Sequence, residues 1–125
     1  MRLLIDTQIV YWFFFESHSL PASARSWMDQ AQSVHLSAAS IWEIAIKVRI
    51  GKMRADPQKV AQNLERAGFL ELPISARHTV RVAEMPLHHS DPFDRILLAQ
   101  AMSEDMRFLT ADEQLPQYSE LVIQV

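Results

Sequence analysis

The sequence predicts an α/β fold in which helices cover both faces of a small parallel sheet, that is, a three-layer α/β/α sandwich. Short apolar runs, typical of strands buried on both faces, alternate with segments whose apolar residues repeat at helical spacing. Strands separated by helices favour right-handed β–α–β units, which make the strands parallel. The 125 residues suffice for a sizeable core, so we expect a single domain over residues 1–125.

The first elements follow from an apolar run and two helix-start signals. Residues 3–5 are all apolar and end at Asp6, as in a buried strand. Thr7 can cap a helix over residues 9–15, and Pro21 opens a second helix that continues to about residue 31. The helix at 9–15 carries more aromatic rings than one buried face absorbs, so we expect a second subunit or another protein to cover part of it.

The middle of the chain predicts a strand over residues 34–36 and a helix over about residues 39–50. In that helix the apolar residues recur at helical spacing, at Ile41, Ile44, Ala45 and Val48. Gly51 suits the left-handed conformation that often follows a helix. A further helix is expected to start near Pro57 and to stop before Gly68.

The last third predicts three strands and two helices. The expected elements are a strand over residues 69–72, a short helix that Ser75 caps and that continues to about residue 84, a central helix over residues 92–105, and strands over residues 107–109 and 121–125. All five strands are short and mostly apolar, as the predicted buried sheet requires.

The start of the central helix carries two acids with two competing interpretations. Asp91 fits the N-cap, Pro92 the first helical position and Asp94 the third. In the simpler interpretation, the two carboxylates form a capping box and complement the helix dipole. In the other, Asp94 lines a pocket and binds a cation, because it lies in line with the core-facing residues Leu97, Leu98 and Ala101.

Composition excludes several classes of protein. The chain has no cysteine, which excludes disulfides and cysteine zinc sites and is compatible with the reducing cytoplasm, where we expect the protein to reside. The apolar run at residues 9–15 is far too short to span a membrane, so we expect no membrane association. The net charge of −3 argues against nucleic-acid binding by bulk electrostatics. Any binding of nucleic acid would then depend on local basic patches or on a metal ion in an acidic site.

Four carboxylates are expected to converge at one edge of the sheet. Asp6 and Asp112 each follow a predicted strand, Asp94 starts a helix at the same edge, and Glu43 lies on a helix that can flank it. Taken singly, Asp6 could cap a helix, Glu43 could pair with Lys47, and Asp112 could form a turn with its neighbour. Together they form an all-oxygen ligand set, which suits Mg²⁺ or Mn²⁺ and phosphodiester hydrolysis.

Two groups of basic residues could contact phosphate. The end of the helix that carries Glu43 and the segment after it contain four basic residues, Lys47, Arg49, Lys52 and Arg54. The candidate substrate contacts among them are Lys47, Lys52 and Arg54. A solvated helix end is the alternative explanation for this segment. His88 and His89 precede the central helix, although two exposed loop histidines are more often solvated.

Four segments resemble one known family over the whole chain. LLIDT, SIWEIAIKVRIGK, HHSDPFDRILLAQA and FLTAD are similar to PIN-domain nucleases, especially the VapC-like ribonuclease toxins of bacterial type II toxin–antitoxin pairs. The resemblance implies that Asp6, Glu43, Asp94 and Asp112 are the catalytic and metal-binding acids. Asp91 is then either a fifth site residue or only the N-cap, which we favour. The resemblance also implies a small parallel sheet between helices, Mg²⁺- or Mn²⁺-dependent cleavage of single-stranded RNA, a homodimer, and a cognate antitoxin as partner.

Other classes of function remain open at this point. A PIN-like fold without turnover could bind RNA or protein. A phosphorelay receiver has a similar length, but it needs a pair of acids after the first strand and a phospho-accepting Asp after a middle strand, whereas Asp56 lies outside any apolar run. A phosphatase with a nucleophilic Asp would carry a second Asp where this chain has Gln8.

Overall fold

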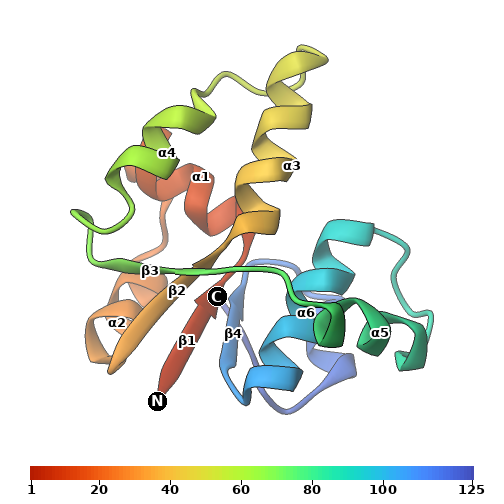
Figure 1. The fold of residues 1–125 in the computed structure, drawn as a ribbon. Helices are drawn as coiled ribbons and strands as arrows, with labels where there is room; N and C mark the ends of the chain where they lie inside the picture. Colours follow the sequence, from red (N-terminus) through yellow and green to blue (C-terminus); the bar gives the residue numbers. More distant parts are fainter.

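A computed structural model describes all 125 residues and has one five-stranded sheet at its centre (Figure 1). The strands are β1 (Arg2–Ile5), β2 (Ser33–Ser37), β3 (Phe69–Leu72), β4 (Arg107–Thr110) and β5 (Val122–Gln124). Their order across the sheet is β3-β2-β1-β4-β5, and every neighbouring pair is parallel. The predicted parallel α/β sheet is therefore confirmed, and each predicted strand is present to within two residues at either end.

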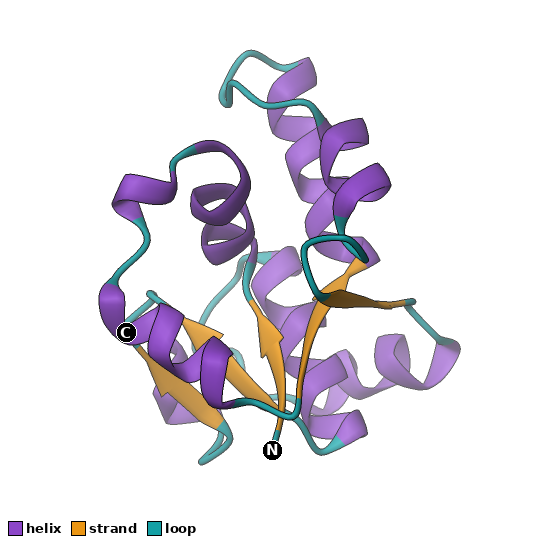
Figure 2. Ribbon diagram, turned by 90° about the vertical axis from the view of Figure 1, so that its left-hand side faces the viewer, coloured by secondary structure: helices purple, strands orange, loops and turns teal.

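Six helices and two short 3-10 turns connect the strands. They are α1 (Thr7–Phe15), α2 (Ala22–Gln30), α3 (Ala38–Arg49), α4 (Pro57–Asn63), α5 (Ala76–Glu84) and α6 (Pro92–Glu104), with turns at Ser17–Ser19 and Leu115–Tyr118. Helices α1, α2 and α4 lie on one side of the sheet and α5 and α6 on the other, which gives three layers (Figures 1 and 2). Helix α3 extends beyond the end of the sheet and contacts both α1 and α6 (Figure 1).

The central strand β1 distributes its side chains between two hydrophobic cores. Leu3 and Ile5 belong to the core beneath α1, α2 and α4, whereas Leu4 belongs to the core beneath α6. All three are fully buried, because successive side chains of a strand point to opposite faces and both faces are covered. The continuous apolar run of β1 is thus explained by burial on two sides. No helix is both long and apolar enough to cross a bilayer.

The helix starts agree with their predicted caps in all but one case. The Ser75 hydroxyl accepts from the backbone N–H of His78, and Asp91 caps α6. Thr7 does not cap α1, so that prediction was wrong: Asp6 is the N-cap, and its carboxylate accepts from the N–H of Ile9. Thr7 instead lies inside the helix, where its hydroxyl donates to Ser40 of α3 at 3.0 Å and ties the two helices together.

Candidate active site

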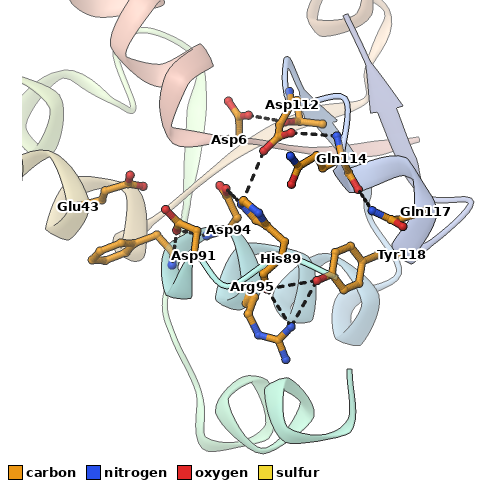
Figure 3. A network of polar contacts seen from close by, with 12 residues as sticks. Asp6, Glu43, His89, Asp91, Asp94, Arg95, Asp112, Gln114, Gln117 and Tyr118 are labelled. Atoms are coloured by element: carbon orange, nitrogen blue, oxygen red, sulfur yellow. Dashed lines mark hydrogen bonds and ion pairs between the residues drawn. The ribbon is translucent and has the colours of Figure 1, made fainter. Parts of the chain in front are cut away.

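A polar cavity of about 400 Å³ opens at the carboxyl edge of the sheet, between the starts of α1 and α6 and the side of α3. Its walls are Asp6, Thr7, Gln8, Trp12, Glu43, Lys47, Met53, Asp91, Asp94, Ala111 and Asp112. The four predicted acids and Asp91 therefore meet in one place, although they come from distant parts of the sequence (Figure 3). The parallel topology brings them together, because it gathers strand ends and helix starts at one edge.

Asp6 both caps α1 and lines the cavity. One carboxylate oxygen accepts from the N–H of Ile9 at 2.8 Å and the other from the hydroxyl of Thr110 at 2.5 Å. The side chain is almost fully buried, and burial raises the pKa of Asp6 to about 6 despite these hydrogen bonds. Thr110 also accepts from the N–H of Asp112 at 3.0 Å, so this hydroxyl links two of the acids.

Asp94 lies on the first turn of α6 and faces the cavity. The capping-box interpretation was wrong, because Asp91 alone caps the helix: it accepts from the N–H groups of Phe93 and Asp94 at 2.8 and 3.0 Å. The Asp94 carboxylate instead contacts the ring nitrogen Nε2 of His89 at 2.8 Å. Burial, more than the charges of neighbouring acids, raises the pKa of Asp94 to about 6.

Glu43 has one oxygen that no protein group satisfies. The predicted pair with Lys47 is present at 2.7 Å, but it is not on an exposed helix face, because only 7% of the Glu43 side chain is exposed. That pair uses Oε2, while Oε1 is buried and without a hydrogen-bond partner. Burial lowers the pKa of Lys47, but the hydrogen bond and charge of Glu43 outweigh it and raise that pKa overall, so the ammonium group stays charged.

Asp112 lines the cavity, and His89 lies beside it, in contact with Asp94 and Asp112. One Asp112 oxygen accepts from the N–H of Gln114 at 2.9 Å, so its turn contact is with Gln114 and not with Glu113. The other oxygen lies 3.7 Å from Nε2 of His89. His89 is therefore not a solvated loop histidine, and its hydrogen bond to Asp94 raises the pKa of the imidazole. The sequence offered no periodicity in this loop from which His89 could have been identified.

A second cavity of about 460 Å³ adjoins the first and is basic. It is lined by Gln8, Tyr11, Lys47, Lys52, Met53 and Arg54, and it shares Gln8, Lys47 and Met53 with the acidic cavity. The three predicted substrate contacts thus lie beside the acids, whereas Arg49 lines neither cavity. An anionic chain could extend from one cavity into the other.

The donor set of the acidic cavity fits a hard divalent cation. Carboxylate oxygens dominate it, and an unpartnered buried oxygen of Glu43 faces the same space. Two carboxyls whose pKa values are raised by burial would regain favourable charge on binding a cation. The rival catalytic arrangements lack such a set: Asp56 caps α4 away from both cavities, and the phosphatase position is Gln8.

Comparison with known proteins gives one family and one fold. The sequence pattern of the PIN domain family matches residues 3–121. No curated protein matches the sequence significantly. The structure is similar to that of VapBC2 from Rickettsia felis bound to a promoter DNA fragment, with a TM-score of 0.70 and 15% identity over 99% of this chain and 98% of that one.

Two further solved structures have the same fold. A toxin–antitoxin complex from Klebsiella pneumoniae gives a TM-score of 0.68 and 18% identity over 98% of this chain and 96% of that one. FitAcB from Neisseria gonorrhoeae gives a TM-score of 0.66 and 14% identity over 98% and 96%. At such low identities, the likeness establishes the fold and not the activity.

Proposed function

The chain belongs to the PIN domain family, and from this premise we propose that it is a Mg²⁺- or Mn²⁺-dependent endoribonuclease that cleaves single-stranded RNA. The observation that carries the proposal is the meeting of Asp6, Glu43, Asp94 and Asp112 in one cavity, with Oε1 of Glu43 left without a protein partner. Unrelated surface acids would be solvated or paired, so this arrangement favours a bound cation and water.

The four acids have distinct roles in the proposed reaction. Asp6, Asp94 and Asp112, with Glu43 beside them, would hold the ion, which when bound lowers the pKa of water and offsets negative charge on the phosphate. Oε1 of Glu43 can orient the attacking water and take its proton, because no protein donor occupies that oxygen. Thr110 and the α1 backbone keep Asp6 in place.

The adjoining basic cavity supports an unpaired RNA strand as substrate. Lys52 and Arg54 can hold backbone phosphates on one side of the acids, and Lys47 lies at the boundary between the two cavities. Aromatic rings line both cavities, Trp12 the acidic one and Tyr11 the basic one. Such rings stack on bases only when the bases are not paired, so they favour a single strand.

We propose that the partners are a cognate antitoxin and a second copy of the chain, and that the protein acts in the cytoplasm. The similar structures named as toxin–antitoxin complexes support the antitoxin. The aromatic side chains of α1 are only half-buried, although Phe13 and Phe14 stack against Phe69 at centroid distances of 4.9 and 5.9 Å. More exposed apolar residues lie on α3 and at its C-cap, where Trp42 and Ile50 are 57% and 58% exposed. Both helices offer apolar surface for partner chains.

Incubation of the full chain with a mixed single-stranded RNA pool and Mn²⁺ tests the proposal. We expect cleavage that EDTA stops and that Glu43→Gln abolishes, with Glu65→Gln as the matched control, since Glu65 is exposed and lines neither cavity. RNA binding without cleavage in the unmodified chain would instead support a silent binding module. Loss of cleavage in both variants would contradict the assignment of the reaction to this cavity.

A further inference from the structure

His89 lies among the acids in a position that the metal-binding role of those acids does not explain. Its Nε2 atom is 2.8 Å from Oδ2 of Asp94 and 3.7 Å from Oδ2 of Asp112 (Figure 3). One ligand atom from each of these three side chains lies within 4.8 Å of the other two. Two ligands at right angles around an ion at 2.0–2.1 Å are about 3 Å apart, so this spacing suits a shared coordination sphere.

The loop that carries His89 is held by a buried arginine. The backbone oxygen of His89 accepts from the guanidinium of Arg95 at 3.3 Å and from the hydroxyl of Tyr118 at 3.3 Å (Figure 3). Arg95 also donates to the backbone oxygens of Pro86 at 2.8 Å and Val82 at 3.0 Å. It has no carboxylate partner, and its two terminal nitrogens donate to backbone oxygens of residues 82–89 and to Tyr118.

This arrangement fixes the backbone of His89 more firmly than a surface loop requires. A buried guanidinium is costly unless its donors are satisfied, and here satisfying them fixes the loop between α5 and α6. The neighbouring His88 is exposed, and its ring packs edge-on against Tyr118 at 5.1 Å, away from the acids. Of the two adjacent histidines, only His89 therefore contacts acids that line the cavity.

We propose that His89 is a nitrogen ligand of the divalent ion, together with Asp94 and Asp112, and that it biases the site toward transition-metal ions over Mg²⁺. The inference rests on the proposed metal-dependent function. Mg²⁺ strongly prefers oxygen ligands, whereas imidazole is a favoured ligand of Fe²⁺, Ni²⁺ and Zn²⁺, and Mn²⁺, although it also prefers oxygen, accepts an imidazole nitrogen more readily than Mg²⁺ does. Oε1 of Glu43, which is buried and unpartnered in the same cavity, is the independent sign that a ligand belongs there.

Pulsed electron paramagnetic resonance of Mn²⁺ bound to the full chain tests this assignment directly. We expect coupling between Mn²⁺ and an imidazole ¹⁴N nucleus in the unmodified protein, which requires no variant to fold. The coupling should disappear in His89→Ala and persist in His88→Ala, the matched control. Titrations should give about tenfold weaker Mn²⁺ binding in His89→Ala, with a smaller loss for Mg²⁺, so the preference for Mn²⁺ falls.

The outcomes separate this inference from the proposed function. If Mn²⁺ binds, Asp94→Asn weakens that binding, and neither the ¹⁴N coupling nor an effect of His89→Ala is found, the inference is overturned while the metal site stands. If Mn²⁺ does not bind the unmodified chain at all, both fail. Coupling that persists in His89→Ala would assign the nitrogen to another residue and would also overturn the inference.

Discussion

Two polar clusters include residues of α6, and they differ in what satisfies their side chains. The first joins Ser37, Gln100 and His78, all at most 2% exposed. The second is the acidic cavity around Asp6 and Asp94. Both put polar atoms into a hydrophobic fold, which is costly without hydrogen bonds.

In the first cluster the protein satisfies all side-chain polar atoms but one: Nε2 of His78 has no hydrogen-bond partner and lies 3.7 Å from a carboxylate oxygen of Glu104. The Ser37 hydroxyl donates to the Gln100 carbonyl oxygen at 2.6 Å and accepts from the N–H of Ala39. The Gln100 amide donates to the backbone oxygen of Pro73 at 3.2 Å, and His78 accepts from the N–H of Ser75. These contacts fasten β2, α5 and α6 together through partners that the protein itself supplies.

In the acidic cavity the protein leaves charge uncompensated. An oxygen of Glu43 has no partner, and burial raises the pKa values of Asp6 and Asp94 to about 6. The difference between the clusters teaches that burial of polar groups does not by itself mark a functional site. The acidic cavity differs because the fold gathers several carboxylates there, and burial raises the pKa values of two of them.

Asp6→Asn should have the largest effect, since it removes a proposed metal ligand and keeps the fold. Asn caps helices as well as Asp does, so α1 should still start at Thr7. Loss of several kcal/mol of metal-dependent stabilisation should lower RNA cleavage with Mn²⁺ at least about 100-fold. Single-turnover cleavage and circular dichroism measure the two effects. An Asn variant that cleaves normally would remove Asp6 from the site.

The stability of the metal-free protein should depend on pH through the same acids. A folded-state pKa of about 6 for Asp6, above the ordinary 3.8, means that the folded protein binds more protons than the unfolded chain. Protonation of Asp6 therefore adds to the free energy of unfolding. This contribution is complete below pH 3.8 and disappears as pH rises through about 6. For Asp6 it amounts to about 3 kcal/mol.

Urea unfolding in EDTA across this pH range measures the effect. The difference in unfolding free energy between the unmodified protein and Asp6→Asn isolates Asp6, because the remaining titrating groups are common to both. We expect the unmodified protein to lose stability relative to the variant as pH rises from 4 to 7. If the unmodified protein instead gains stability relative to the variant as pH rises, the Asp6 carboxylate is satisfied by its protein partners.

Gln100→Leu should have the opposite effect to Asp6→Asn: it should reduce stability and leave the response to metal unchanged. It leaves the Ser37 hydroxyl and the Pro73 carbonyl without their partner, which should cost about 1–3 kcal/mol of unfolding free energy. The stabilisation by Mn²⁺ should be unchanged, because Gln100 does not line the acidic cavity. Thermal melts with and without Mn²⁺ measure both quantities. A lost metal response in this variant would mean that the two clusters are not independent.

Replacement of Lys52 and Arg54 by Ala should give the smallest effect. RNA binding should weaken by a similar factor for all sequences, and the slope of log affinity against log salt should fall by about one per lost phosphate contact. Lys59 and Arg66 are exposed and line neither cavity, so their replacement is the control. An unchanged slope would support the alternative of a solvated helix end.

The fold and the acid set could be predicted because both follow from local patterns. Buried strands such as β1 have continuous apolar sequences, and Asp6, Asp94 and Asp112 stand at strand ends or helix starts, which meet at one edge in a parallel sheet. The places of His89 and Thr110 could not be predicted. His89 depends on the distant donors Arg95 and Tyr118, and Thr110 on the pairing of β4 with β1.

The sequence also could not identify the partner chains, nor could it show why the pKa values of the acids are raised. Burial raises these pKa values more than repulsion among the acids does, and burial is a property of the packed structure. The sequence indicated too many aromatic rings on α1. It could not show that Phe69 of β3 would pack against two of them.

Thermal melts of the unmodified protein and Asp94→Asn, each with and without Mn²⁺ at pH 7, test the central claim most directly. Because the Asp94 carboxyl is buried among other acids, we expect the metal-free Asn variant to be as stable as the unmodified protein, or more so. Mn²⁺ should raise the melting temperature of the unmodified protein, and much less that of the variant. A variant that is destabilised without metal, and that keeps both its Mn²⁺-induced shift and its ribonuclease activity, would contradict the account.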